Sequence, residues 1–75
     1  MPTLIRLEGL RVLMYFNDHP LPHVRVRLSE GRECTVALAT LRITGPVAAR
    51  EIGDALRWIA TNRRSLQQLW RDNAS

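Results

Sequence analysis

Apolar and polar residues alternate strictly in two stretches in the first half of the chain, His23 to Leu28 and Glu33 to Ala39. Successive side chains of a β-strand point to opposite faces, so a period of two predicts strands with one apolar face. The apolar members are Val24, Val26, Leu28, Cys34, Val36 and Leu38. We therefore expect two neighbouring strands that contribute one side of a core.

The two stretches are close enough in sequence to form a hairpin. Their like faces meet when Val26 lies opposite Val36 and Leu28 lies opposite Cys34, because a shift by one residue would exchange the faces. This register needs a loop with an odd number of residues, and Glu30–Arg32 fits. A five-residue loop stays open as an alternative, since the glycine is not the last residue of the shorter loop.

Three further segments have the composition of short strands. Leu4–Leu7 and Leu41–Thr44 are each followed by a glycine within two residues, and Arg11–Phe16 is rich in β-forming residues. No helical pattern separates these segments. Residues 1–45 are therefore predicted to form an antiparallel β-meander of three to five strands.

From about Val47 the apolar period changes to 3.6 residues, which predicts a helix. A continuous helix from Val47 to Asp72 would be about 39 Å long, whereas a compact chain of this length has a diameter of ~29 Å. Arg63 also interrupts the apolar stripe. Either the helix bends near residues 61–64 and restarts at Ser65, which we favour, or its end overhangs to meet another subunit.

Strands followed by a helix, without β-α-β alternation, predict an α+β fold. The simplest two-layer arrangement packs the helical part, residues 46–75, on one face of the meander and leaves the other face open. We expect residues 1–75 to form a single domain.

The net positive charge of the chain favours partners that carry negative charge. The chain has eleven basic residues, all of them arginine, and a formal net charge of +4. Either this reflects the codon bias of a GC-rich genome, or guanidinium groups serve for bidentate phosphate contacts and stacking on bases. A core of this size supplies only about 3–5 kcal/mol, so a homodimer is a further expectation.

The cysteine content and the apolar runs bear on the compartment. The single cysteine, Cys34, cannot form an intrachain disulfide or hold a metal by itself, and we expect it to point into the core. No apolar run approaches the ~18 residues of a membrane span, and the N-terminus has no signal-peptide core. We expect a cytoplasmic protein that contacts no membrane and needs no cofactor.

The open face of the sheet is the first candidate functional surface. The alternation places His23, Arg25 and Arg27 there, and Arg11 and Tyr15 join them if the apolar residues between those two face the helix. Basic groups beside an aromatic ring suit single-stranded RNA, which is held by phosphate contacts and base stacking. Arg11, Tyr15, Arg25 and Arg27 are therefore candidate nucleic-acid-binding residues, and an ordinary solvated face is the alternative.

The two histidines lie in and beside a stiff loop, because Pro20 and Pro22 exclude a helix there. No metal site is predicted, since this spacing aligns two histidine ligands only on a helix. Imidazole titrates near neutrality, so His19 and His23 are candidate catalytic groups for metal-free, ribonuclease-like acid–base chemistry. Histidines that merely brace the turn are the alternative, and whether the protein is an enzyme stays open.

A second candidate surface lies on the helical part. Trp58 lies off the main apolar stripe, at roughly the same helical angle as Leu69. Together with Trp70 these residues predict an apolar edge that serves as an interface.

Segments along the whole chain match one family of small bacterial proteins. They are Met1 to Thr3, Met14 to His19, Pro22 to Val26, Gly45, Trp58-Ile59, Leu66 and Trp70. By these segments the chain resembles the family named domain of unknown function 4160. The family motif runs Asp-His-x-Pro-Pro-His-x-His-Val, and here Leu21 replaces the first paired proline and Arg25 the last histidine. The resemblance implies one half of a two-gene toxin–antitoxin-like pair, with a cognate protein encoded nearby.

We therefore expect a small basic interaction module of a toxin–antitoxin-like pair, with an RNA-facing sheet surface. The alternative is a non-catalytic module that binds a protein or forms a homodimer and has no nucleic-acid role.

Overall fold

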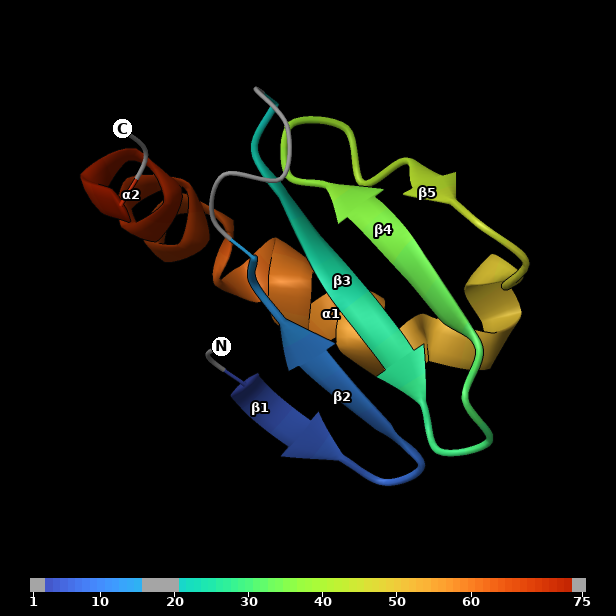
Figure 1. The fold of residues 1–75 in the computed structure, drawn as a ribbon. Coiled ribbons are helices and arrows are strands. Elements are labelled where there is room, and N and C mark those ends of the chain that lie inside the picture. Colours follow the sequence, from blue (N-terminus) through green and yellow to red (C-terminus); the bar gives the residue numbers. More distant parts are fainter. Residues whose placement is uncertain (1–2, 16–20, 74–75) are drawn as a thin grey trace.

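The computed structural model describes residues 3–15 and 21–73, and its first part is an antiparallel five-stranded sheet (Figure 1). The strands lie in sequence order from one edge of the sheet to the other. They are β1 Thr3–Leu7, β2 Leu10–Leu13, β3 His23–Leu28, β4 Glu33–Ala37 and β5 Ile43–Thr44. The predicted meander is confirmed, at the upper limit of its expected strand number.

The hairpin of β3 and β4 forms as predicted, but its register differs from our expectation. Val26 lies opposite Cys34, not opposite Val36, so the pairing is shifted by two residues. The loop has three residues, Ser29–Gly31, and two backbone hydrogen bonds of 2.9 Å close it. Gly31 thereby takes the last loop position with a φ of 109°, which glycine adopts without steric cost. Because the shift is an even number, both faces keep their side chains.

Several strand ends also differ from the expected bounds, and β4 ends at Ala37 instead of Ala39. β2 ends at Leu13, and Phe16, the expected end, lies outside the described residues. β5 begins at Ile43 instead of Leu41. Leu41 has a φ of 61°, in the left-handed region, and its N–H donates to the Ala37 carbonyl at 2.7 Å. This closes a turn where the sequence pattern suggested extended chain.

The helical part is divided, as the length argument predicts. Its elements are the 3-10 helix η1 Ala49–Ile52, α1 Gly53–Thr61 and α2 Arg63–Asn73. Asn62 separates α1 from α2, and both its backbone N–H and its side-chain Nδ2 donate to the Trp58 carbonyl, at 3.0 and 2.9 Å. The bend near residues 61–64 is therefore confirmed, although α2 begins at Arg63 and not at Ser65. The molecule measures 32 × 22 × 20 Å, too short for an unbroken helix of the predicted length.

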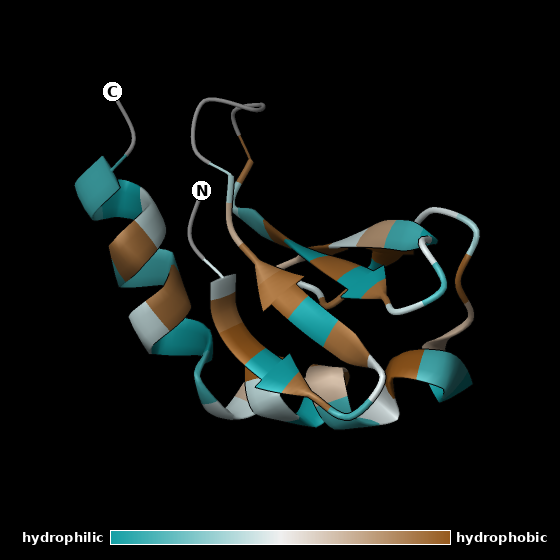
Figure 2. Cartoon of the chain, turned by 60° about the horizontal axis from the view of Figure 1, so that its bottom comes forward, coloured by the Kyte–Doolittle hydropathy of each residue, from teal (hydrophilic) through white to brown (hydrophobic). Residues whose placement is uncertain are grey.

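The helices cover one face of the sheet and bury its apolar side chains (Figure 1). The core comprises Leu10, Val12, Met14, Val24, Val26, Cys34, Val36 and Leu38 from the sheet side, and Val47, Ile52, Ala55, Ile59, Leu66 and Trp70 from the helical part and the segment before it. Figure 2 shows the alternation of apolar and polar residues along the strands that produces this separation. The predicted α+β arrangement, with its second sheet face turned away from the helices, is confirmed.

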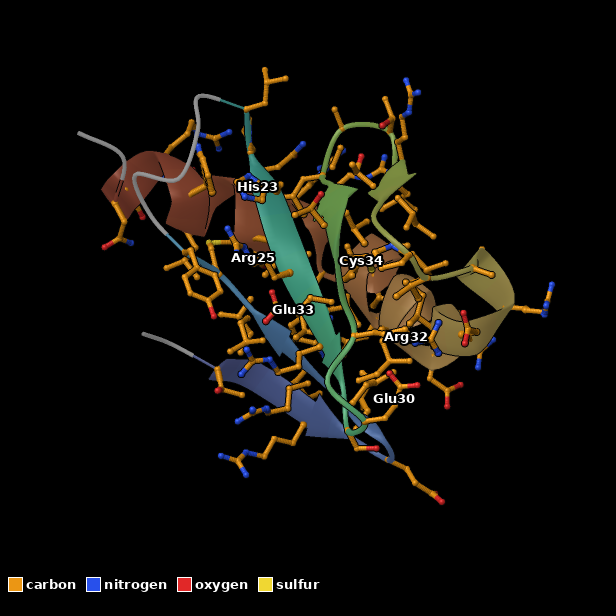
Figure 3. All side chains as sticks on the ribbon, turned by 45° about the vertical axis from the view of Figure 1, so that its right-hand side comes forward. His23, Arg25, Glu30, Arg32, Glu33 and Cys34 are labelled. Carbon is orange, nitrogen blue, oxygen red and sulfur yellow. The ribbon has the colours of Figure 1, made fainter. Side chains whose placement is uncertain are left out.

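Arg32 connects the β3–β4 hairpin to the helical part (Figure 3). Its Nε lies 2.9 Å from Glu30 Oε1, and its Nη2 lies 2.6 Å from Glu51 Oε1 in η1. Nη1 also donates to the Pro46 carbonyl at 2.9 Å. The hydrogen bond from Arg32, together with one from the Ala48 N–H, lowers the pKa of Glu51 to about 2. One side chain thus links the sheet to the start of the helical part.

Candidate nucleic-acid interface

Three arginines form a row across the face of the sheet that the helices leave uncovered. Arg6 in β1 lies directly opposite Arg11 in β2, and Arg11 lies directly opposite Arg27 in β3. Val12 beside Arg11 and Val26 beside Arg27 are fully buried in the core, so these two arginines point to the other face. Arg6 points to that same face because it lies directly opposite Arg11. We call Arg6, Arg11 and Arg27 the arginine row. Like charges at directly opposite positions destabilise a sheet, so this arrangement needs a compensating interaction.

Among the described residues, a carboxylate offsets the positive charge at one end of the arginine row only. Arg27 Nε lies 2.7 Å from Glu33 Oε2, and Glu33 occupies the next position of the same row, in β4. Among residues 3–15 and 21–73, neither Arg6 nor Arg11 has a carboxylate within ion-pair distance. Two guanidinium groups are therefore left to bind an external anion.

The arginine row borders a depression of about 550 Å³ at one end of the sheet. The β1–β2 and β3–β4 turns meet there, because the Ser29 N–H donates to the Gly9 carbonyl at 2.9 Å. Its lining consists of the three arginines together with Leu7, Gly9, Leu10, Leu28, Ser29 and Gly31. The guanidinium groups offer several hydrogen-bond donors to an extended anion such as a nucleic-acid backbone.

Arg25 and Tyr15 form a stacked pair next to the arginine row. The Arg25 Cζ lies 4.4 Å from the centre of the Tyr15 ring, which is a cation–π distance. Arg25 Nη1 also lies 3.6 Å from Glu33 Oε1, on the same side of the sheet (Figure 3). Arg25 therefore covers one face of the tyrosine ring, and the pair presents a planar cation beside an aromatic group. In RNA-binding proteins, bases stack on aromatic rings and on guanidinium planes of this kind.

His23 is on the same face of β3 but is buried, with 2% of its surface exposed. Its Nδ1 lies 2.9 Å from the Leu21 carbonyl, and its ring centre lies 4.9 Å from that of Trp70. The other predicted catalytic residue, His19, lies outside the described residues. An acid–base role for His19 and His23 stays a prediction, and it requires that substrate reach a ring packed against tryptophan.

The three residues of the predicted interface edge differ in how deeply they are buried. Trp70 is 6% exposed and belongs to the core, and its ring also contacts that of His23. Trp58 and Leu69 are half-buried and pack against the core cluster from its margin. Only Trp58 and Leu69, of the three predicted residues, retain surface for a partner in this single chain.

Cys34 is buried in the core, as expected, and its thiol is not bonded to another cysteine. Burial raises the pKa of the thiol, which keeps it in the unreactive protonated form. Across residues 3–15 and 21–73, no three His, Cys, Asp or Glu side chains come together in a way that could hold a metal ion. No helix in the described part of the chain combines the length and apolar character needed to cross a membrane.

Arg6 belongs to this surface but was not among the residues predicted from the sequence pattern. The two-residue turn Glu8-Gly9 sets Leu7 opposite Leu10 and therefore sets Arg6 opposite Arg11. Gly9 has a φ of 77°, close to the value required at the third position of a type II turn. The sequence signal that could have identified Arg6 as a residue of this surface is the tight turn at Glu8-Gly9. Counting residue pairs outward from that turn places Arg6 opposite Arg11.

Comparison with known proteins supports the resemblance noted in the sequence. The model of the family described as Domain of unknown function (DUF4160) matches residues 9–71. This range runs from the β1–β2 turn into α2, and it includes Arg11 and Arg27 but not Arg6. No curated protein and no solved structure matches the chain. Because the match covers most of the 75 residues, the chain belongs to the DUF4160 family.

Proposed function

We propose that this protein binds single-stranded RNA on the open face of its sheet. The observation that carries the proposal is the arginine row, in which Arg6, Arg11 and Arg27 lie directly opposite one another on adjacent strands. Backbone phosphates would supply the negative charge that this arrangement lacks, with release of their counterions. Arg25 and Tyr15 add planar groups on which bases stack.

A single strand fits this surface better than a duplex does. Recognition through stacking needs bases that are not paired within a helix, and the Arg25–Tyr15 pair lies beside the arginine row on the same face. A single strand can place its phosphates at the arginine row and its bases on the Arg25–Tyr15 pair at the same time. In this proposal Arg11, Arg25, Arg27 and Tyr15 keep their predicted roles, and Arg6 joins them.

The biological setting that we propose is one half of a toxin–antitoxin-like pair in the cytoplasm. Its support is the family resemblance together with a basic surface suited to an RNA target. Co-expression with the product of the neighbouring gene tests this role. A stable complex that changes the growth effect of either protein is the expected result, and two proteins that neither bind nor affect growth would refute it.

Fluorescence anisotropy with a labelled single-stranded RNA, measured across a salt series, tests RNA binding. We expect Arg6→Gln/Arg11→Gln to weaken binding at least about tenfold and to reduce the salt slope by about 1.4, since each lost contact to a single strand contributes about 0.7. The matched control is Arg50→Gln/Arg64→Gln, which removes the same charge from exposed positions of η1 and α2. Equal losses in both variants, or a flat salt slope in the unmodified protein, would refute the proposal.

A protein-binding or homodimerising module is the second candidate function. The half-buried Trp58 and Leu69 at the margin of the core favour it, because apolar side chains left at an edge gain from coverage. Sedimentation with the unmodified protein and with Leu69→Glu separates the two candidates. If the unmodified protein is a dimer and Leu69→Glu is a monomer, the result supports an interface at this edge. If both proteins are monomers, the homodimer is excluded.

A further inference from the structure

A second hollow, of about 250 Å³, lies on the same face of the sheet at the far end of β3 from the arginine row. Its lining consists of Leu21, Pro22, His23, Thr35, Ala37, Arg42 and Thr44. It is therefore built from the start of β3, from β4, and from the turn that leads into β5. We call it the threonine pocket.

The polar groups of the threonine pocket converge because of strand register. Thr35 in β4 lies directly opposite Thr44 in β5 and, on its other side, directly opposite Arg25 in β3. Among the residues that the structure describes, the side chains of Thr35, Thr44 and Arg42 have no hydrogen-bond partner. Two hydroxyl groups and one guanidinium group thus remain for a ligand.

The pocket is held in shape by its backbone. Leu41 N donates to the Ala37 carbonyl at 2.7 Å, and Ala37 N donates to the Arg42 carbonyl at 3.0 Å. The positive φ of Leu41 turns the chain at this point and brings Arg42 back beside β4. A pocket formed before its ligand arrives loses little entropy on binding.

The chemistry of these groups selects a nucleobase. Thr hydroxyls donate and accept hydrogen bonds, whereas the Arg42 guanidinium only donates, so the pocket favours a planar group with carbonyl oxygens on its edge. Apolar atoms of Pro22 and Ala37 line the same space and suit the faces of a base. We propose that the threonine pocket receives one unstacked base of the bound RNA, with uracil or guanine preferred over adenine.

This inference rests on the proposed RNA binding and adds base selection to it. The row of Arg25, Thr35 and Thr44 lies two residues along β3 from the arginine row. That separation is about 6.6 Å at 3.3 Å per residue. A strand whose phosphates bind at the arginine row thus passes over Arg25 and delivers a base to the threonine pocket.

The test compares three labelled probes of equal length: an oligouridylate, an oligoadenylate, and an oligomer of abasic ribose phosphates. The unmodified protein should bind the oligouridylate more tightly than the oligoadenylate, and about tenfold more tightly than the abasic oligomer, since one well-placed base contributes a factor of this order. Thr35→Val/Thr44→Val should reduce this ratio to about threefold or less and leave the salt slope unchanged. Valine keeps the branched shape that suits a strand.

Controls separate the pocket from the arginine row and from folding. Arg6→Gln/Arg11→Gln should weaken binding of all three probes and keep the uridylate preference. Arg42→Gln, at an exposed turn position, tests the pocket without altering a strand, and Thr61→Val on α1 is the matched threonine control.

Three outcomes decide the question. Equal affinity for the uridylate and abasic probes, with a steep salt slope, overturns the pocket and leaves the arginine row standing. The pocket is also overturned if both Thr35→Val/Thr44→Val and Arg42→Gln keep the full preference for the oligouridylate over the abasic oligomer. Absence of binding to every probe overturns the pocket and the proposed function together.

Discussion

Glu33 and Arg27 lie directly opposite each other in β4 and β3, with Glu33 Oε2 2.7 Å from Arg27 Nε. The same carboxylate reaches Arg25 at 3.6 Å, so one acid neutralises two of the basic groups on the open face. Glu33 thus occupies the position that an RNA phosphate would take if it bound Arg25 and Arg27 together. The protein's own carboxylate and its proposed ligand compete for the same donors.

Replacing Glu33 by glutamine should strengthen RNA binding. Glu33→Gln removes the charge that competes with a phosphate for Arg27, so we expect a several-fold gain in affinity and a salt slope steeper by up to about 0.7 for the added contact. Stability should fall by about 1 kcal/mol or less, because the pair is partly exposed. Anisotropy titrations and urea denaturation measure the two effects.

The matched control for this change is Asp54→Asn, which removes the same charge from a pair with Arg57 on α1. It alters the net charge equally but lies in the helical part. If Asp54→Asn raises RNA affinity as much as Glu33→Gln does, only the net charge matters, and the open face is not the binding site.

Acid should weaken the link between the hairpin and the helical part. The hydrogen bonds from Arg32 and the Ala48 N–H lower the pKa of Glu51 from the ordinary 4.5 to about 2. A carboxylate with a lowered pKa in the folded state stabilises the fold above its unfolded value, and this contribution is lost as the pH falls through the folded value. We expect stability to decline between pH 4.5 and about 2.

Glu51→Gln should remove this dependence and lower the free energy of unfolding at neutral pH. Urea denaturation at several pH values on both sides of the window measures it. Glu8→Gln, at an exposed turn position between β1 and β2, is the control for loss of one negative charge. Identical acid profiles for Glu51→Gln and the unmodified protein would contradict the assignment of the effect to Glu51.

Gly45→Ala should be among the most destabilising single substitutions in the chain. A Cβ at this position would lie 2.9 Å from the Glu33 carbonyl oxygen and 3.0 Å from the Cys34 Cα, both of them backbone atoms. Gly45 also has a φ of 133°, which side-chain-bearing residues rarely adopt. Steric overlap and backbone strain together predict a loss of about 2–4 kcal/mol.

Gly31→Ala separates these two causes. Gly31 has a φ of 109°, but a Cβ there would have no atom within 4 Å. Its substitution should cost about 1–2 kcal/mol from strain alone. Thermal or urea denaturation of both variants gives the comparison, and a smaller loss for Gly45→Ala than for Gly31→Ala would rule out the close packing against β4.

The Cys34 thiol should resist modification in the native protein. Its side chain is 3% exposed, and burial raises the pKa of the thiol above its usual value of 9.0. The thiolate, which is the reactive form, is therefore scarce at neutral pH. A chromogenic thiol reagent should react slowly with the native chain and rapidly in denaturant. Fast reaction without denaturant would mean that the β4 segment opens readily.

The structure buries His23, whereas the arginine row lies on the open face of the sheet. The motif around His19 and His23 is the most specific part of the family resemblance, yet His23 packs against Trp70 from α2, more than forty positions later in the chain. No periodicity in the sequence links these two residues. Their contact depends on where the bend at Asn62 directs α2, so the burial of His23 was beyond sequence reasoning.

The sequence by itself determined which residues share a face and where the helix must break. Alternation is a local property of a strand, so Arg11, Arg25 and Arg27 were assigned to one face without knowledge of the register. The helix break followed from comparing its length with the size of the molecule.

Tertiary structure decided which of those residues touch. Register depends on which loop residue adopts the left-handed conformation, and Gly31 moved the β3–β4 pairing by two positions. That register places Thr35 beside Arg25, and the tight β1–β2 turn completes the arginine row with Arg6. Contacts between strands are set by loop geometry and packing across the sheet, which a single segment's pattern does not contain.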